Sequence, residues 1–221
     1  MVEISEQEEL FIKIGNLLEK KISVYAIGGT AMMLRSIKNY TLDIDFVFDK
    51  KSDRDEFILT LKKMGFKESD VTLVYGLRNN VPIMLKLENI RIDLFMNKII
   101  TSTFSEKMKE RAKQIHEFGK NLIVKVADPN DVIIMKSATS RNKDIEDITL
   151  IFKKSQINWE IIINEAEEQV SLGNEGAVLY LGEKLEKLNN KKEIVFPKET
   201  QDKLWKLLKK QVDKKAKENK K

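Results

Sequence analysis

The periodicity of apolar positions changes past the middle of the chain. Up to residue 126, helical spacing alternates with short strand-like runs, whereas the part after Pro129 keeps helical spacing, with breaks at 173–174 and 189–198. The pattern predicts helices over residues 4–21, 31–37, 52–64 and 102–113, and strands over 24–27, 43–48, 72–75, 81–87, 90–96, 114–118 and 122–126. This order predicts an α/β (α+β) fold, in which a mixed twisted sheet flanked by helices is followed by a helical C-terminal region.

Turn residues set the expected boundaries of these elements. Ser52 is expected to cap the helix that Gly65 ends, and the Gly119-Lys120-Asn121 segment is expected to turn a hairpin. The change of periodicity predicts two domains, a core over residues 1–127 and a helical region over residues 128–221.

A glycine pair separates the strand at 24–27 from the helix at 31–37. Gly28 and Gly29 supply the bend, and Thr30 follows them directly. A glycine bend that opens a helix directs backbone N–H groups toward an anion, and the helix dipole adds to the attraction. The segment therefore predicts a phosphate site.

Paired carboxylates follow in the next apolar run. Asp43 and Asp45 are two positions apart, so in an extended strand they point to the same face. Asp93 is the one acid in the strand-like run at 90–96. A single strand aspartate is more often a solvated edge or a hairpin end, but three on neighbouring strands would repel one another unless they bind cations. Such a set can hold two hard cations about 4 Å apart.

In the order Gly28-Gly29-Thr30, then Thr-x-Asp-Ile-Asp at 41–45, then Ile-Asp-Leu at 92–94, the chain resembles the polymerase-beta-like nucleotidyltransferase superfamily. The likeness covers roughly residues 22–150 and favours the stand-alone prokaryotic branch that includes the nucleotidyltransferase toxins of toxin–antitoxin pairs. It implies that Gly28, Gly29 and Thr30 hold a nucleoside triphosphate such as ATP. It also implies that Asp43, Asp45 and Asp93 bind two Mg²⁺ ions, with Mn²⁺ as a substitute, and that Asp93 activates the incoming hydroxyl.

A second charged block begins at residue 128. Asp128-Pro129-Asn130-Asp131 is typical of a helix start. The segment that follows carries Lys136, Arg141, Asp144 and Asp147, a spacing similar to the late motif of the same branch, which implies nucleotide binding by Lys136, Arg141 and Asp144. The alternative is a solvated helix on which Lys136 and Arg141 pair with Asp144 and Glu146.

Composition narrows the remaining classes. No apolar stretch of the 221 residues approaches the roughly 20 needed to span a bilayer, and the acidic start lacks a signal peptide's features, so a cytoplasmic protein without a membrane partner is expected. The sequence contains no cysteine and one histidine. Disulfides, thiolate catalysis and cysteine-ligated zinc are excluded, as is a cluster of histidine ligands within one chain.

The basic charge of the chain is concentrated in its last segment. Residues 198–221 contain 10 lysines and 4 acids, a net charge of +6, whereas the whole chain has 40 − 35 = +5. Leu204, Trp205 and Leu208 give the first half of this tail an apolar stripe that would pack on the body, and Trp159 and Trp205 are expected to be core anchors. The lysines would then form a solvated face, or bind RNA or a cognate protein.

Together these features predict a Mg²⁺-dependent nucleotidyltransferase that moves NMP from an NTP to a hydroxyl of RNA, protein or a small molecule and releases pyrophosphate. Two alternatives stay open at this stage. One is a non-catalytic module on the same fold that binds nucleotide, RNA or a partner. The other is a transferase of the antibiotic-modifying kind, which differs in its acceptor.

Overall fold

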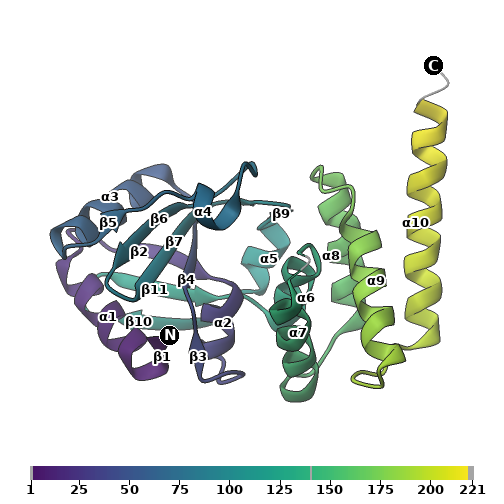
Figure 1. Cartoon of the computed structure of the whole chain (residues 1–221), viewed down its shortest axis with the longest axis horizontal. Helices are drawn as coiled ribbons and strands as arrows, with labels where there is room; N and C mark the ends of the chain where they lie inside the picture. The colour runs from purple at the N-terminus through teal and green to yellow at the C-terminus, as the bar shows by residue number, and fades with distance from the viewer. Residues whose placement is uncertain (1, 140, 219–221) are drawn as a thin grey trace. The chain divides into compact units, whose positions relative to one another are not determined.

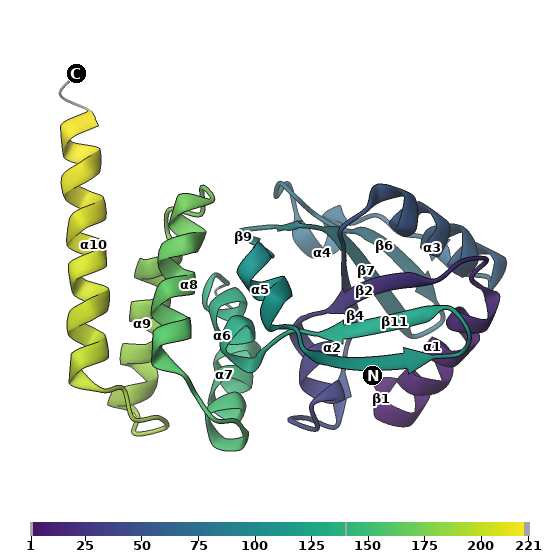
Figure 2. The ribbon, with the colours of Figure 1, turned by 180° about the vertical axis from the view of Figure 1, so that it is seen from behind.

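The computed structural model describes residues 2–139 and 141–218, and Figures 1 and 2 show it from opposite sides. The last residues of the lysine-rich tail, 219–221, lie outside the described part. The chain divides into two compact units, Met1–Asp128 and Pro129–Lys221, and each is described by itself below. Within the described residues, no helix is both long and apolar enough to cross a membrane.

The first unit is built on a seven-stranded mixed sheet with the order β10-β11-β2-β4-β7-β6-β5 (Figure 1). Two of its neighbouring pairs, β11 with β2 and β4 with β7, are parallel, and the other four are antiparallel. The sheet strands are β2 (Ile22–Ala26), β4 (Ile44–Phe48), β5 (Lys67–Glu68), β6 (Ile83–Leu87), β7 (Ile90–Met96), β10 (Gln114–Phe118) and β11 (Leu122–Val126). The helices are α1 (Ile4–Leu17), α2 (Gly28–Leu34), α3 (Lys51–Lys63), α4 (Thr72–Tyr75) and α5 (Glu106–Arg111). Two short ribbons pair β1 (Val2–Glu3) with β3 (Tyr40–Thr41) and β8 (Lys98–Ile99) with β9 (Ser102–Thr103).

Alternation along β4 separates an apolar face of the sheet from a polar one. Phe46 and Phe48 are fully buried against Phe57 of α3, and Phe46 also contacts Phe11 of α1. Asp45 directly precedes Phe46 in the strand, so its side chain points to the opposite face. The aromatic core therefore holds β4 in the register that presents Asp45 on the polar face.

The structure confirms the predicted mixed sheet and several of its strands. The Ile90–Met96 strand has the predicted bounds, and so does the hairpin of β10 and β11, whose turn contains Gly119 at φ +59°. The helix predicted over 102–113 is shorter, because β9 occupies its start and Ser105 caps α5 by accepting a hydrogen bond from Met108 N. The predicted Ser52 cap is also wrong: α3 begins after Lys50 without a side-chain cap.

The strand predicted over 72–75 is the helical turn α4. Asp70 Oδ1 accepts hydrogen bonds from Thr72 N at 2.8 Å and from its hydroxyl at 2.7 Å, a local pattern that favours a turn over an extended strand. Tyr75 is buried, whereas Leu73 is 83% exposed. The segment therefore buries one side chain of a helical turn, whereas a strand would have buried one whole face.

The second unit consists of helices only, in its described part. They are α6 (Pro129–Ser137), α7 (Asn142–Lys154), α8 (Trp159–Ser171), α9 (Ala177–Asn190) and α10 (Lys198–Glu218). The helical run predicted from Pro129 onward is broken between α6 and α7, where Lys184 Nζ donates to the backbone carbonyls of Ser137 and Thr139 and so satisfies acceptors at the end of α6. Trp159 stacks on Phe196, but Trp205 is 61% exposed, so the prediction of Trp205 as a core anchor is wrong.

Candidate active site

The glycine turn lies directly against the strand that carries the acids. Gly28 is the first residue of α2 and has φ +55°, the left-handed region that favours glycine. A Cβ atom added to Gly28 would lie 2.8 Å from Asp45 Oδ2. The first hydrogen bond of the turn runs from Ala31 N to Ile27 O, so the N–H groups of residues 28–30 precede it.

Thr30 connects this turn to the acid strand. Its side chain is fully buried, and its Oγ1 accepts a hydrogen bond from Asp45 N at 2.9 Å. The hydroxyl thus fixes the distance between the glycine turn and Asp45. A direct contact between Thr30 and phosphate, which the family resemblance implies, stays a prediction.

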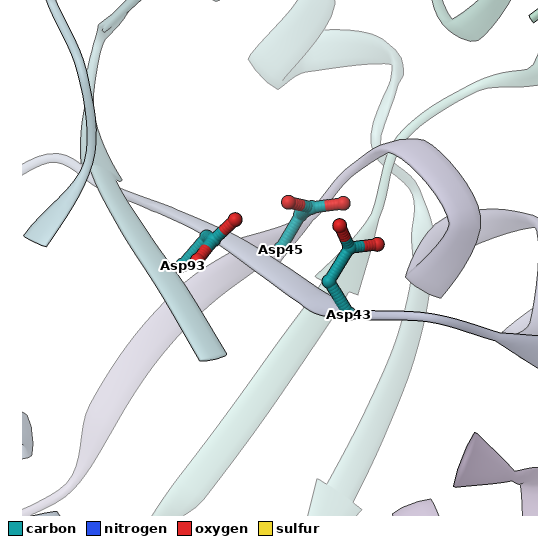
Figure 3. A group of neighbouring side chains, drawn as sticks. All are labelled: Asp43, Asp45 and Asp93. Carbon is teal, nitrogen blue, oxygen red and sulfur yellow. The ribbon is translucent and has the colours of Figure 1, made fainter. Parts of the chain in front are cut away.

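Three carboxylates meet on the polar face of the sheet. Strands β4 and β7 are parallel and place Asp45 directly opposite Asp93, while Asp43 lies just before β4. Each acid offers an oxygen, and these oxygens lie within 4.8 Å of one another (Figure 3). Asp93 is fully buried, and Asp43 and Asp45 are partly exposed, so the cluster is open on the side of β4.

Arg91 and Tyr75 contact the acid cluster, and the sequence analysis missed both. The Arg91 guanidinium forms ion pairs with Asp43 Oδ2 and, at 3.2 Å, with Asp93 Oδ2. The Tyr75 hydroxyl donates a 2.5 Å hydrogen bond to the same oxygen of Asp93. Arg91 precedes Asp93 by two positions, so strand alternation could have placed the two on one face. Tyr75 could not be found in this way, because residues 72–75 were predicted as a strand and form a helical turn.

The donor set suits a hard divalent cation. All three side chains offer carboxylate oxygens, the ligands that Mg²⁺ and Mn²⁺ prefer, and no nitrogen or sulfur donor is needed. Carboxylates this close together repel one another, and a bound cation would offset that repulsion. The residues present therefore fit a bound divalent cation.

Lys136, Arg141 and Asp144 belong to the second unit and form a cluster there. The Lys136 ammonium lies 3.0 Å from Asp144 Oδ1 and 2.6 Å from Asp147 Oδ2, and all three side chains are buried. Arg141 Nε donates to Asp144 Oδ2 at 2.8 Å, but its own side chain is 62% exposed. The expected pairing of Lys136 with Asp144 is present, but it is a buried network instead of a solvated helix face.

The electrostatics of this cluster are dominated by Asp144. Its burial opposes ionisation, but the nearby Lys136 ammonium and hydrogen bonds from Arg141 and Thr139 outweigh burial and lower the pKa of Asp144 to about 2. In contrast, burial lowers the pKa of Lys184, whose ammonium lies on the carbonyls that end α6. Asp144 is thus ionised at neutral pH and orients the exposed Arg141.

Comparison with known proteins places the chain in a family. Residues 8–178 match the family model described as a nucleotidyltransferase of unknown function (DUF6036). The chain belongs to this nucleotidyltransferase family. The predicted relation to nucleotidyltransferases is confirmed, and the chain is identified as a nucleotidyltransferase enzyme.

Other comparisons add little to this family assignment. A solved structure, ANT(2″)-Ia in complex with adenylyl-2″-tobramycin, has 16% sequence identity and a TM-score of 0.47, and the alignment covers 82% of this chain and 98% of that one. No curated protein matches the sequence.

Proposed function

We propose that this nucleotidyltransferase moves NMP from an NTP to an acceptor hydroxyl in a Mg²⁺-dependent reaction that releases pyrophosphate. The observation that carries the proposal is the convergence of Asp43, Asp45 and Asp93 beside the glycine turn. Both features stand on the polar face or at its edge, and the buried core behind β4 holds them in register.

Each site residue described in the first unit has a role in this proposal. Asp43, Asp45 and Asp93 would hold two Mg²⁺ ions, and the N–H groups of residues 28–30 would bind the triphosphate. Bound divalent cations would neutralise phosphate charge and lower the proton affinity of the acceptor hydroxyl. Tyr75 and Arg91 would orient the Asp93 carboxylate through the contacts to its Oδ2.

The reaction is an in-line displacement at the α-phosphorus. The acceptor oxygen forms a bond to that phosphorus, and the bond from it to the bridging oxygen of the β-phosphate breaks. The electron pair of the broken bond leaves with pyrophosphate, and the hydroxyl proton passes to the Asp93 carboxylate. Arg91 and Tyr75 keep this carboxylate in place while it accepts the proton.

Lys136, Arg141 and Asp144 are proposed to contribute to nucleotide binding with unequal roles. Lys136 is buried between two carboxylates, so a direct contact with phosphate would require it to leave them. Arg141 is exposed and is oriented by Asp144, and its planar guanidinium suits a phosphate or a base. We therefore propose that Arg141 contacts the nucleotide and that Asp144 and Lys136 support its orientation.

The test of this proposal is the Asp45→Asn variant, which removes one charge with almost no change in shape. Transfer from labelled NTPs in the presence of Mg²⁺ is expected to fall at least about 100-fold, because even residues behind a metal ligand contribute up to that factor. Without metal, the variant should be at least as stable as the wild type, since one of three crowded charges is gone.

Asp55→Asn on α3 is the matched control, since Asp55 forms an exposed pair with Lys51 at 3.8 Å. The assay should follow label into total RNA, into protein and into small-molecule acceptors, because the acceptor is the least constrained part of the proposal. Wild-type transfer by Asp45→Asn would reject the assignment. Absence of transfer by the wild type with any NTP would favour a module that binds nucleotide without catalysis.

A further inference from the structure

Three cations lie in one row across the sheet, next to the acid cluster. The strand register places Lys67 of β5 opposite Lys86 of β6, and Lys86 opposite Arg91 of β7. Residues that face each other across antiparallel strands share a face of the sheet, so all three point to the polar face. Arg91 is two positions from Asp93, so the row begins at the acid cluster.

Arg91 is paired with acids, but the two lysines of this row have no such partners among the described residues. Like charges directly opposite each other destabilise a sheet. Among the described residues, neither Lys67 nor Lys86 has an ion-pair partner. Glu68, the acid next to Lys67, points to the other face and pairs with Lys62 of α3. Lys86 is partly buried, whereas Lys67 at the edge strand is exposed.

The order of the strands separates this row from the glycine turn. The turn follows β2, on one side of β4, whereas the row crosses β7, β6 and β5 on the other side. Strand β4 lies between β2 and β7 in the sheet (Figure 1), and its Asp45 lies opposite Asp93 of β7. If the triphosphate occupies the glycine turn, as proposed above, the row lies on the side from which the acceptor hydroxyl approaches.

The length of the row favours a chain of anions over a single one. Two strand spacings of about 4.8 Å put the Lys67 and Arg91 backbones roughly 10 Å apart. The row also ends at β5, which is the edge of the sheet, so a ligand can continue past it. A single-stranded nucleic acid has repeated phosphates and reactive hydroxyls, and it is bound through lysines that displace counterions.

We propose that Lys67 and Lys86 form a binding site for the phosphodiester backbone of a single-stranded RNA acceptor, and that the row leads this acceptor from the edge of the sheet to Arg91 and Asp93. This proposal rests on the proposed function for the identity of the acid cluster. The binding step itself needs neither metal nor NTP, so it can fail or succeed independently of nucleotide transfer.

The experiment compares the wild type with the double variant Lys67→Gln/Lys86→Gln. Binding of a fluorescent single-stranded RNA oligonucleotide is followed by anisotropy at several salt concentrations, without metal or NTP. The variant should bind at least roughly tenfold more weakly at low salt. Its slope of log affinity against log salt should be shallower by about 0.7 for each lost phosphate contact. Lys67→Arg/Lys86→Arg keeps both charges and should keep the affinity.

Lys13→Gln/Lys120→Gln is the matched control, because it removes the same charge from exposed positions on α1 and in the β10–β11 turn. An equal loss of RNA binding in this control would overturn the proposal, because net charge alone would then explain the effect. Unchanged RNA binding in the Lys67→Gln/Lys86→Gln variant would also overturn it. Weaker NTP binding in that variant, measured by calorimetry with Mg²⁺, would assign the two lysines to nucleotide binding and reject their assignment to the acceptor.

Discussion

Gly28 is the residue at which the turn and the acid cluster meet. Its positive φ and the short distance to Asp45 both require the absence of a side chain. Either condition alone would favour glycine, but the second also links the shape of the turn to the position of a proposed metal ligand. A substitution at Gly28 should therefore affect stability and the acid cluster together.

Gly28→Ala is expected to lower the free energy of unfolding by about 1–2 kcal/mol from backbone strain, with a further loss because the new methyl group displaces Asp45. The rate of nucleotide transfer should also fall, because the displaced Asp45 is a proposed metal ligand. The control is Gly182→Ala, at a helical position of α9 where an added Cβ meets nothing within 4 Å, and it should stabilise the protein by up to about 1 kcal/mol. Chemical denaturation of both variants measures the free energy of unfolding. Equal stabilities of Gly28→Ala and Gly182→Ala would contradict the prediction.

The sequence predicted the acids but not their partners, for a physical reason. Alternation along a strand is local, so the shared face of Asp43 and Asp45 could be read directly, and the parallel pairing of two apolar runs brings Asp93 beside them. The contacts of Asp93 with Tyr75 and Arg91 depend on side-chain packing and on a turn that resembles a strand in its composition. The functional roles of the acids and of residues 28–30 stay predictions.

At the scale of elements, the best predicted pieces are those with strong turn signals. The β10–β11 hairpin has an unambiguous glycine turn, and both its strands keep period-two alternation. The break between α6 and α7 had no such signal. It depends on Lys184 from a distant helix and on Asp144 of α7, which contacts Lys136 of α6 and Thr139 in the break. Spacing alone could not reveal either contact.

The Asp144 network should make the second unit sensitive to acid. A pKa of about 2, below the 3.8 of an ordinary aspartate, means that ionised Asp144 stabilises the fold above pH 4 and loses this effect as the pH falls toward 2. The difference corresponds to about 2 kcal/mol. Asp144→Asn should remove this part of the pH dependence and be less stable at neutral pH, since Lys136 loses one of its two carboxylates.

Urea unfolding between pH 2 and 7 measures this effect, with tryptophan fluorescence as the signal, because both tryptophans, Trp159 and Trp205, lie in the second unit. Asp202→Asn, which removes an exposed acid of α10, is the control. If the difference in stability between wild type and Asp144→Asn does not change over pH 2–4, the assigned role of the ion pair is wrong.

At the scale of the whole molecule, the net charge of +5 comes from α10 and the residues after it. Contacts with α8 and α9 hold α10 in the second unit, and its Leu204 side chain is buried at 4% exposure. The helix is therefore a packed element with a basic outer surface. Binding of RNA or a cognate protein by this surface stays a prediction.

Leu204→Ala is expected to lower the free energy of unfolding by about 2–5 kcal/mol, because it leaves a cavity under α10. Val212→Ala is the control, since Val212 is 59% exposed and its change should stay within about 0.5 kcal/mol. Truncation after Glu199 should lower the melting temperature and spare transfer to a free small acceptor. If the truncated protein kept the salt slope of RNA binding, a nucleic-acid role for α10 would be excluded.

The parallel pairing of β11 with β2 also has a consequence for synthesis. Ile22 pairs with Leu122, so the backbone edge of β2 that pairs with β11 stays unpaired until the ribosome has added another 100 residues. At about 5–20 residues per second, the delay is roughly 5–20 s. During this interval β2, an apolar strand with an unsatisfied backbone edge, is available to other nascent chains. Conditions that slow translation between residues 26 and 122 should therefore favour aggregation of the nascent protein, even though the finished sheet buries this strand in its interior.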